Sequence, residues 1–463
     1  MPVDPLTLEI PYADPVALFA RVADDPYAVL LHSAARDARG RHSFIAADPF
    51  SLLVCRDGIV EIDGAPVAGA APLDIVRARL ERYAQPAVAG PGLFRGGAVG
   101  YLGYEMGRHL ERVPRPPADA MDVPEMQLML CDVVVVVDHL ERRAHIVSTG
   151  HPEQDDGARR ARARERLAAT APRFADVEPL PDPPAPRAAP RIAADLPREA
   201  YEAAVRRVVD YILAGDVFQA NLSQRFRAEL PHGLVPLDLY RRLCAANPAP
   251  FAAYLKLDDV VLASSSPERF VRVSGDLVET RPIKGTRPRG RSEAEDAALA
   301  DELVASEKDR AENVMIVDLL RNDLSRVCRD GSVEVSELCA LERFATVMHL
   351  VSTVTGRLRP GLGPVDLLAA CFPGGSITGA PKIRAMEIIA ELEPTRRGAY
   401  CGAVGYLGFD GSMDTSIVIR TLTIRGRELT FQAGGGVVAA STPDGEYEET
   451  LTKAAAVVAA LSP

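Results

Sequence analysis

The chain has 463 residues, of which 47% are hydrophobic and 25% are charged, a composition typical of a globular protein with two domains or one large core. Its 53 basic and 64 acidic residues give a net charge of −11, which argues against nucleic acid or an anionic membrane as the main partner. The strongest apolar run, Val133 to Val137, is far too short to span a bilayer. It predicts a buried strand.

The N-terminus and the cysteines indicate a compartment. The chain begins Met1-Pro2-Val3-Asp4-Pro5 and lacks the basic and hydrophobic regions of a secretory signal. Seven cysteines are present, without any C-x-x-C pair. An odd number without metal-binding spacing is typical of reduced core cysteines. We therefore expect a cytoplasmic protein without disulfides.

Residues 1–150 are expected to form a β-rich N-terminal region. Short segments with strand-like composition are separated by Gly and Pro, and they cover Ala28–Leu31, Phe44–Ala46, Leu52–Cys55, Ile59–Ile62, Ala98–Leu102 and Val133–Val137. Helical spacing appears between them, from Pro72 to Tyr83.

Residues 151–194 are expected to form a helix followed by a linker. The segment 155–170 is rich in Arg and Ala and predicts a helix, whereas the proline-rich segment 179–190 can form neither a helix nor a central strand. The arginines of this helix have no aromatic residues between them, so a solvated helix face is favoured over an RNA-binding patch.

Residues 195–463 are expected to form a second, catalytic domain in which helices and strands alternate. The pattern predicts a helix over Arg198–Leu213, a strand over Ala252–Leu257 and one long helix over Ser292–Leu320. No fixed-period repeat is visible, so an α/β (α+β) fold is favoured. One local similarity, between 97–105 and 402–410, indicates either related sheets that pack together or convergence on a common strand pattern.

The segment Pro282–Thr286 contains the most informative side chain, Lys284. A lysine can act as a nucleophile only as a neutral amine, which requires its pKa to be lowered by desolvation or by neighbouring cations such as Arg281, Arg287 and Arg289. Taken alone, a lysine in an Arg-rich turn is more simply a solvated loop cation.

Other segments support the interpretation that Lys284 is catalytic. They are Ser264–Phe270, Asp309–Leu324, Ala345–Leu350, Pro373–Lys382, Gln432–Gly436 and Glu446–Lys453. Together with Pro282–Thr286 this set resembles the chorismate-utilising enzymes, which include anthranilate synthase component I, aminodeoxychorismate synthase component I, and the isochorismate and salicylate synthases. The resemblance runs from about residue 195 to the C-terminus. It implies the anthranilate synthase component I fold, with β-sheets sandwiching helices and a C-terminal chorismate-binding domain.

Within this family, a lysine in P-I-K-G-T resembles aminodeoxychorismate synthase component I, whereas anthranilate synthases usually have alanine there. The resemblance implies that Lys284 attacks C2 of chorismate while the C4 hydroxyl leaves, and that ammonia then attacks C4 and expels the lysine. The base lysine of isochorismate and salicylate synthases is replaced here by Gln219. Both positions therefore favour 4-amino-4-deoxychorismate, the precursor of p-aminobenzoate and folate, as the product.

Two acidic pairs suggest a metal site. Glu446 and Glu449 are three residues apart on a predicted helix, and so are Asp309 and Glu312. Carboxylates with few imidazoles suit Mg²⁺, although such pairs are usually solvated faces or salt bridges. The resemblance implies that Glu312 and Glu449 are the main magnesium ligands, with Glu446 and Asp309 nearby; many relatives have Glu at position 309.

Chorismate carries two carboxylates, so its site needs groups that bind anions. The resemblance implies that Arg420 and Tyr400 bind the enolpyruvyl carboxylate. The glycine run would let backbone N–H groups approach the anion closely. The substrate-binding set implied in this way is Tyr400, Arg420, Gly285, Thr286, Ser376, Gly434, Gly436 and Lys453.

The segment Pro373–Lys382 superficially resembles a phosphate-binding loop. It lacks the required Gly directly before the Lys, because Ala380-Pro381 intervene. Ser376 and Thr378 are instead expected to line the chorismate pocket.

Acid and base roles are assigned to Glu268 and His349. The resemblance implies that Glu268 protonates the leaving hydroxyl, which requires a proton held near neutrality, as burial would favour. A lone histidine in an apolar segment is more often a core residue, but His349 matches a family histidine that polarises or orients the substrate.

No Cys-His-Glu glutaminase region is recognisable, so ammonia must be free or must come from a glutamine amidotransferase subunit, with the chain a monomer or part of a heterodimer. Anthranilate synthase component I is the main alternative. A regulatory pseudoenzyme and a nucleotide-binding protein are more distant alternatives. The segment Leu30–Ser33 resembles one that contributes to a tryptophan pocket in this family; as a bare pattern it is a buried strand that ends in a turn.

Overall fold

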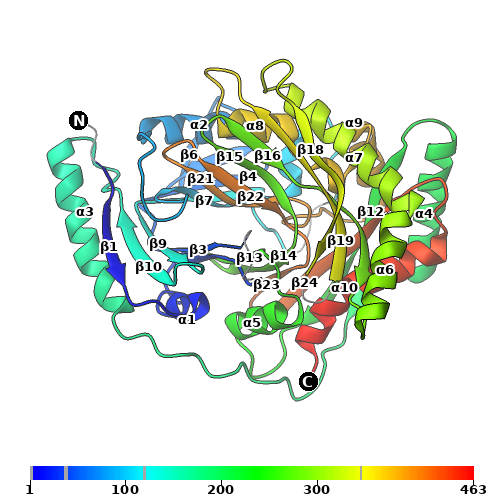
Figure 1. Cartoon of the computed structure of the whole chain (residues 1–463), viewed down its shortest axis with the longest axis horizontal. Helices are drawn as coiled ribbons and strands as arrows, with labels where there is room; N and C mark the ends of the chain where they lie inside the picture. The colour runs from blue at the N-terminus through cyan, green and yellow to red at the C-terminus, as the bar shows by residue number, and fades with distance from the viewer. Residues whose placement is uncertain (1–3, 36–39, 118–120, 345–346) are drawn as a thin grey trace.

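Two large antiparallel sheets form the centre of the molecule, and helices cover their outer faces (Figure 1). The computed structural model describes residues 4–35, 40–117, 121–344 and 347–463. Ala345 and Thr346, which belong to one of the family-like segments, lie outside these ranges. Each sheet has twelve described strands.

The first sheet contains strands from both ends of the chain. Their spatial order is β1 (Leu6–Ile10), β10 (Arg143–Ser148), β9 (Val133–Asp138), β3 (His42–Ala46), β2 (Val29–His32), β13 (Phe251–Leu257), β14 (Val260–Ser266), β23 (Thr421–Arg425), β24 (Glu428–Val437), β12 (Gln219–Glu229) and β11 (Ala193–Ala194), and β20 (Gly379–Ala380) pairs with β12.

The second sheet has the same mixed origin. Its order is β17 (Ile283–Pro288), β19 (Val347–Arg357), β16 (Leu277–Thr280), β15 (Arg269–Ser274), β22 (Met413–Ile417), β21 (Ala403–Gly408), β7 (Gly97–Leu102), β8 (Met126–Cys131), β4 (Ser51–Arg56), β5 (Ile59–Ile62) and β6 (Ala65–Val67), and β18 (Glu334–Arg343) pairs with β19.

Helices lie on both sides of the paired sheets. The α-helices are α1 (Pro15–Ala20), α2 (Pro72–Arg82), α3 (Asp156–Thr170), α4 (Arg198–Leu213), α5 (Pro236–Ala246), α6 (Glu293–Ala305), α7 (Glu307–Ser325), α8 (Pro364–Cys371), α9 (Lys382–Leu392) and α10 (Pro443–Leu461), and the 3₁₀ helices are η1 (Tyr104–His109), η2 (Ala171–Phe174) and η3 (Gly375–Ile377). In the view of Figure 1, α2 and α8 lie above the sheets and α1 and α5 lie below them.

Three large hydrophobic clusters define the layers. The middle cluster contains residues of both sheets, for example Leu255 of the first sheet and Val99 and Tyr406 of the second. The other two clusters join one sheet to α2 and α8, and the other sheet to α1, α5 and α10. The helices therefore flank the paired sheets, whereas the expected arrangement placed helices between sheets.

The sequence pattern located the N-terminal strands well. The run Val133–Asp138 forms β9, and all five of its valines are buried. The reason is that β9 lies inside a sheet with apolar layers on both faces, so neither side of the strand faces water. Residues 179–190 contain neither helix nor strand, as their proline content predicted.

The two similar segments prove to be neighbouring strands. β7 and β21 pair antiparallel, with Gly100 opposite Gly405 and Ala98 opposite Leu407. This pairing joins the N-terminal region directly to the C-terminal one. The boundaries at 150 and 195 stay a prediction, but both sheets contain strands from both sides of these boundaries.

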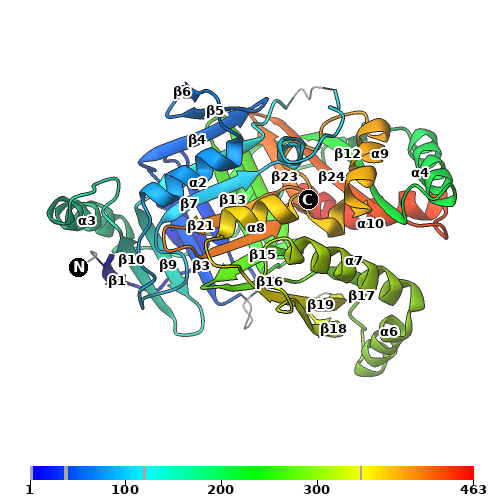
Figure 2. The ribbon, with the colours of Figure 1, turned by 90° about the horizontal axis from the view of Figure 1, so that it is seen from above.

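The predicted long helix over 292–320 is wrong in one respect, because it is two helices. Ser306 ends α6 and begins α7 in an extended conformation (φ −65°, ψ 104°), and its hydroxyl accepts a hydrogen bond from the N–H of Asp309 at 3.2 Å. A serine whose side chain caps the following turn competes with continued helix. The break lets α6 and α7 follow β17 and β19 at different angles (Figure 2).

Within the described ranges, no helix is both long enough and apolar enough to cross a membrane. All seven cysteines are free; six are buried and Cys244 is half-buried.

Candidate active site

The Lys284 side chain occupies the centre of the predicted site. It projects from β17, and its Nζ donates a 3.2 Å hydrogen bond to the carbonyl oxygen of Ser376 in η3. Its charge interacts with those of Glu268, Glu312 and Glu449, which come from three other elements. The structure thus gathers four of the predicted residues around one amine.

Burial lowers the pKa of Lys284, and the nearby ammonium of Lys453 lowers it further, against the opposing effect of the three carboxylates. The expected contribution of the neighbouring arginines is not observed. Each arginine is paired with carboxylates of its own: Arg281 with Glu342, Arg287 with Glu302 and Asp309, and Arg289 with Asp296. Desolvation and a second lysine therefore favour the neutral amine.

Glu268 lies in the turn between β14 and β15 and is only 6% exposed. Burial raises its pKa, while a hydrogen bond with the Ser376 side chain and the charge of Lys284 oppose the increase. The turn is fixed by hydrogen bonds from the Ile417 N–H to the Glu268 carbonyl at 3.1 Å and from the Ser266 hydroxyl to the Ile417 carbonyl at 2.6 Å. Burial of this carboxyl group therefore favours its protonated form, as a proton donor requires.

Thr286 and His349 face each other across β17 and β19. The Thr286 hydroxyl lies 2.9 Å from His349 Nδ1, and burial lowers the pKa of His349 to about 4. The histidine is therefore neutral at pH 7 and can accept or donate one hydrogen bond without adding charge to the site.

Gly285 lies at a bulge between these two strands with φ +77°. A Cβ at this position would lie 3.0 Å from both Asp309 Cβ and Leu303 Cδ1. The glycine thus permits the bulge and the close approach of α6 and α7. Its substrate-binding role stays a prediction.

The carboxylates of α10 face the glycine run of β24. A Cβ at Gly435 would lie 2.8 Å from Glu446 Oε2 and 2.9 Å from Glu449 Oε1, so both oxygens approach one point on the strand. Glu446 Oε1 accepts a 2.6 Å hydrogen bond from Ser441, whereas its buried Oε2 has no hydrogen-bond partner among the described residues. An unpaired buried carboxylate oxygen is costly unless a cation or water completes it.

Glu312 and Asp309 approach from α7. Burial raises the pKa of Glu312, and the charges of Asp309 and Glu449 add to this effect. Burial would also raise the pKa of Glu449, but Lys453, Lys308 and Lys284 together lower it below its ordinary value. Mutual repulsion among these carboxylates and the open oxygen of Glu446 fit a divalent cation with oxygen ligands.

Asp309 has a different set of contacts from the other three. It pairs with Arg287 at 3.4 Å and packs against Gly285. That Asp309 lies near the metal stays a prediction. Its ion pair with Arg287 directs its carboxylate toward β17.

Lys453 links α10 to β24 and to Arg420. Its Nζ donates to the Gly434 carbonyl at 2.8 Å and pairs with Glu449 at 2.6 Å, while its backbone carbonyl accepts a hydrogen bond from Arg420. Burial lowers the pKa of the Arg420 guanidinium, and the charges of Tyr400 and Glu449 oppose this. The predicted carboxylate-binding arginine is thus desolvated and close to Lys453.

Gly434 and Gly436 pair with Ser223 and Asn221 of β12. A Cβ at Gly436 would overlap Gln219. Gln219 is fully buried, and neither atom of its amide has a hydrogen-bond partner among the described residues. In the sequence, Gln219 was notable only because it replaces the base lysine of isochorismate and salicylate synthases. No local pattern predicted that its amide is buried.

The segment 373–382 divides between the site and the core. Ser376 contacts Lys284 and Glu268, and its place in the chorismate pocket stays a prediction. Thr378 is fully buried, and its hydroxyl donates to the Gly374 carbonyl at 2.9 Å. The expectation that Thr378 lines the pocket is not supported by this contact. Lys382 pairs with Asp323 at 2.6 Å, so a carboxylate already balances its charge.

Arg397 was missed in the sequence. Its guanidinium is buried, lies over the rings of Tyr104 and Tyr400, and hydrogen-bonds Glu393 and the carbonyls of Ile377 and Asn221. It therefore positions Tyr400 against η3 and β12. The only sequence signal was the spacing of four residues to Glu393, which is common on any helix surface.

A cavity of about 460 Å³ lies between the two sheets at the end of β2. Leu31, His32 and Ser33 line it together with Arg41, Arg269 and Arg272, whereas its described lining includes none of the predicted catalytic residues. This is the segment that resembles part of a tryptophan pocket.

Comparison with known proteins identifies the family. A family model described as chorismate binding enzyme matches residues 26–459. The anthranilate synthase component 1 of Thermus thermophilus is 44% identical over 452 residues, which cover 96% of this chain and 95% of that protein. The chain belongs to the chorismate-binding enzyme family.

Other chorismate-binding enzymes refine this result. The aminodeoxychorismate synthase component 1 of Klebsiella aerogenes is 41% identical over 458 residues, which cover 97% of this chain and 98% of that protein. The crystal structure of anthranilate synthase component I from Streptococcus pneumoniae has a TM-score of 0.80 at 34% identity and covers 90% of this chain and 92% of that chain. These comparisons confirm the anthranilate synthase component I-like fold and a chorismate-utilising enzyme. Overall identity does not separate the two activities.

Proposed function

We propose that this chorismate-binding enzyme is the aminating component of an aminodeoxychorismate synthase and converts chorismate and ammonia into 4-amino-4-deoxychorismate. The observation that carries the proposal is the desolvated Lys284 amine beside Glu268 and Ser376. An amine with a lowered pKa supplies a nucleophile, and a carboxyl with a raised pKa supplies a proton.

The proposed reaction has two substitutions. In the first, Lys284 Nζ forms a bond to C2 of chorismate, the C4–O bond breaks, and the proton from Glu268 allows the hydroxyl to leave as water. In the second, ammonia forms a bond to C4 and the C2–N bond to the lysine breaks. The proton released from the incoming nitrogen returns to the Glu268 carboxylate, so the net products are 4-amino-4-deoxychorismate and water.

The remaining residues bind and orient the substrate in this proposal. Arg420 and Tyr400 receive the enolpyruvyl carboxylate, and neutral His349, fixed by Thr286, lies beside the ring. Glu312 and Glu449, with Glu446 and Asp309 nearby, would hold Mg²⁺. When bound, the ion would neutralise the ring carboxylate and stabilise negative charge on it.

Anthranilate synthase is the second candidate. Relatives of both names match at similar identity, 44% for the anthranilate synthase component 1 of T. thermophilus and 41% for the aminodeoxychorismate synthase component 1 of K. aerogenes. In the anthranilate synthase reaction ammonia would attack C2 directly, and a lysine in the position of Lys284 would have no covalent role. The two candidates differ at one side chain and in the product.

We also propose that ammonia comes from a separate glutamine amidotransferase subunit. The purified single chain is expected to use ammonium salts and to fail with glutamine, and glutamine use should appear when a glutaminase subunit is added. Robust glutamine-dependent turnover by the single chain would contradict this part.

Mass identification of the product tests the proposed function. The chain is incubated with chorismate, ammonium and Mg²⁺, and the aromatic or amino-cyclohexadiene product is separated and identified. 4-Amino-4-deoxychorismate supports the proposal. Anthranilate as the main product would assign the second candidate and contradict the first.

A further inference from the structure

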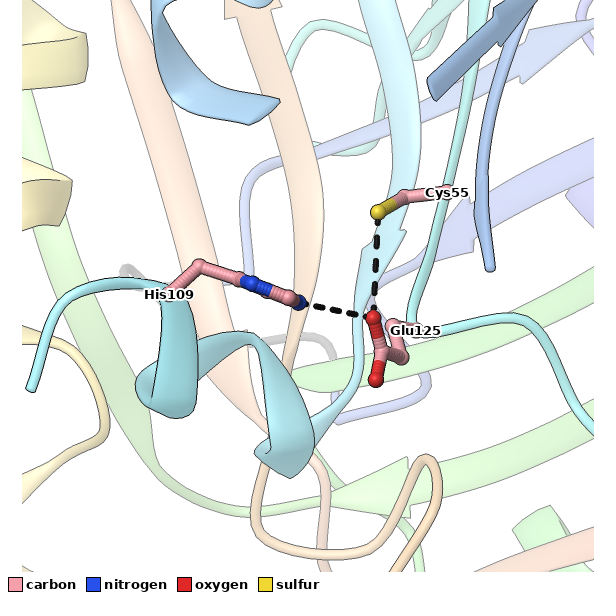
Figure 3. Close-up of side chains that lie close together, drawn as sticks. All are labelled: Cys55, His109 and Glu125. Carbon is pink, nitrogen blue, oxygen red and sulfur yellow. Dashed lines mark hydrogen bonds and ion pairs between the residues drawn. The ribbon is translucent and has the colours of Figure 1, made fainter. Parts of the chain in front are cut away.

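Three side chains with different metal-binding atoms lie close together (Figure 3). They lie beside β4 and β8, near one edge of the second sheet, whereas β17, which carries Lys284, forms its opposite edge. Cys55 comes from the end of β4, His109 is the last residue of η1, and Glu125 precedes β8. One ligand atom of each lies within 4.8 Å of those of the other two, and among the described residues no other group of three His, Cys, Asp or Glu side chains meets this criterion.

We propose that Cys55, His109 and Glu125 form a zinc-binding site. A thiolate, an imidazole and a carboxylate are the ligand types that Zn²⁺ takes, usually with four ligands in a tetrahedron. The three residues would supply three positions, and water would supply the fourth. Magnesium is disfavoured there because it requires oxygen ligands.

The contacts place one carboxylate oxygen at the centre of the group. Glu125 Oε2 lies 2.7 Å from His109 Nε2 and 3.8 Å from Cys55 Sγ, and it accepts a 3.0 Å hydrogen bond from the Gly58 N–H. Ligand atoms about 2.0 to 2.3 Å from a tetrahedral zinc lie roughly 3.3 to 3.6 Å apart. Only small side-chain movements are therefore needed, with His109 moving outward and Cys55 inward.

The charges balance when the metal binds. Without a cation, burial and the Glu125 carboxylate raise the pKa of Cys55 to about 12, so the thiol stays neutral. Zn²⁺ would displace the thiol proton into solvent, and the thiolate and the Glu125 carboxylate together would neutralise the ion. Arg108 opposes binding, because its charge also acts on Glu125.

The same three residue types occur in glutaminases, but the order of contacts here does not suit nucleophilic catalysis. In such a triad the histidine takes the proton of the cysteine. Here Glu125 lies between the two, so Cys55 donates to the carboxylate and not to His109. Cys55 is also fully buried. The group fits a metal and not a thiol nucleophile.

The position of the site indicates a structural role. The Glu125 carbonyl accepts a 2.7 Å hydrogen bond from Gly103, which directly precedes η1. Within η1, the carboxylate of Glu105 accepts hydrogen bonds from the N–H groups of Arg397 and Gly398, next to Tyr400. Zinc would fix both ends of η1 and so stabilise the loop that carries Tyr400. The His109 side chain is 23% exposed and lines a surface cavity, which gives the ion a path from solvent.

Zinc titration of the full chain tests the site without reference to turnover. Protein freed of metal by a chelator is titrated with ZnCl₂ in excess Mg²⁺, so that the acidic group near Lys284 is already occupied. We expect one zinc per chain. Cys55→Ser and His109→Gln should weaken zinc binding by more than about 100-fold. Loss of a residue that only hydrogen-bonds a metal ligand already lowers metal affinity by about 10- to 100-fold. Cys131→Ser is the matched control, since Cys131 is buried and donates only to the Met129 carbonyl.

The cobalt form provides a second readout. Co²⁺ bound to wild-type protein should show a near-ultraviolet charge-transfer band from the thiolate, and this band should be absent from Cys55→Ser. Circular dichroism shows whether Cys55→Ser folds. If it does not, the cobalt band of the wild type and the zinc affinity of His109→Gln, a substitution at a partly exposed position, test the proposed site. A wild-type cobalt spectrum without the band, or zinc binding that His109→Gln leaves unchanged, would overturn the proposal.

Discussion

The amine of Lys284 donates a 3.2 Å hydrogen bond to the backbone carbonyl of Ser376. The side chain of the same serine hydrogen-bonds Glu268. Ser376 therefore connects the proposed nucleophile with the proposed acid. A neutral amine that donates an N–H to a carbonyl keeps its lone pair free, so this contact orients Lys284 without blocking attack on a substrate.

Loss of the Ser376 hydroxyl should change the pH profile of amination. That hydrogen bond favours ionised Glu268, so its removal in Ser376→Ala should raise the pKa of Glu268 further. The acid must be protonated to act, hence activity falls as pH rises through this pKa. We expect the high-pH limb of kcat to move to higher pH, as measured by initial rates across a pH series. In Ser416→Ala, which loses a buried hydroxyl bonded to the Val404 carbonyl, the limb should not move; a shift there as large as in Ser376→Ala would argue against the assignment.

The acidic group should make activity dependent on Mg²⁺. Glu312→Gln and Glu449→Gln keep the side-chain shape and remove a charge, so kcat/KM should fall about 100-fold or more. EDTA should inactivate the wild type, and added Mg²⁺ should restore it. Glu448→Gln is the control, because Glu448 pairs with Arg198 on the outer side of α10. Full activity in EDTA would exclude the metal.

Buried His151 should make stability depend on pH. Its side chain is 2% exposed, and burial followed by the charge of Arg159 lowers its pKa to about 4. The ordinary value is 6.5, so between about pH 4 and 6.5 the unfolded state binds more protons, and stability is lost as pH falls through this window.

Urea unfolding can measure this effect. Relative to His151→Gln, the wild type should lose about 2 to 3 kcal/mol between about pH 7.5 and 4.5. His232→Gln, in an exposed turn, should show the same pH dependence as the wild type. Parallel curves for wild type and His151→Gln would contradict the prediction.

The break between α6 and α7 gives a prediction about stability. Ser306→Ala removes the hydroxyl that accepts from the Asp309 N–H, and loss of such a cap typically costs about 1 kcal/mol. Denaturant unfolding should show this loss. Ser325→Ala is a suitable control, since its exposed hydroxyl bonds the Asn322 carbonyl near the end of α7. Equal stability of Ser306→Ala and wild type would mean that the serine does not determine the break.

Local patterns predicted much of the fold, and tertiary contacts explain what they missed. The valine run of β9 and the prolines of 179–190 fixed their own conformations. Ser306 was overlooked because helical periodicity continues across it, although a serine three residues before Asp309 is a capping signal. The pairing of β7 with β21 joins residues about 300 positions apart, which no local pattern specifies.

The candidate site shows the same division. Family-like motifs named Lys284, Glu268 and Ser376, and the fold places them together. Desolvation lowers the pKa of Lys284, as one of the two expected causes, but the expected contribution of the arginines is wrong. The sequence shows which arginines are near along the chain but not that carboxylates already pair with them. Arg397 was missed, and the burial of the Gln219 amide was not foreseen, because the local sequence does not show which polar side chains are buried.

The covalent role of Lys284 is tested most directly by intact mass spectrometry of protein incubated with chorismate and Mg²⁺ in the absence of ammonia. Covalent attack by Lys284 should give an adduct with the mass of chorismate less one water, mapped to the peptide that contains Lys284. Lys284→Ala should lack the adduct and lose amination at C4, and Lys284→Arg should not restore either, because a guanidinium stays protonated. Wild-type rates of 4-amino-4-deoxychorismate formation by Lys284→Ala would show that Lys284 has no covalent role.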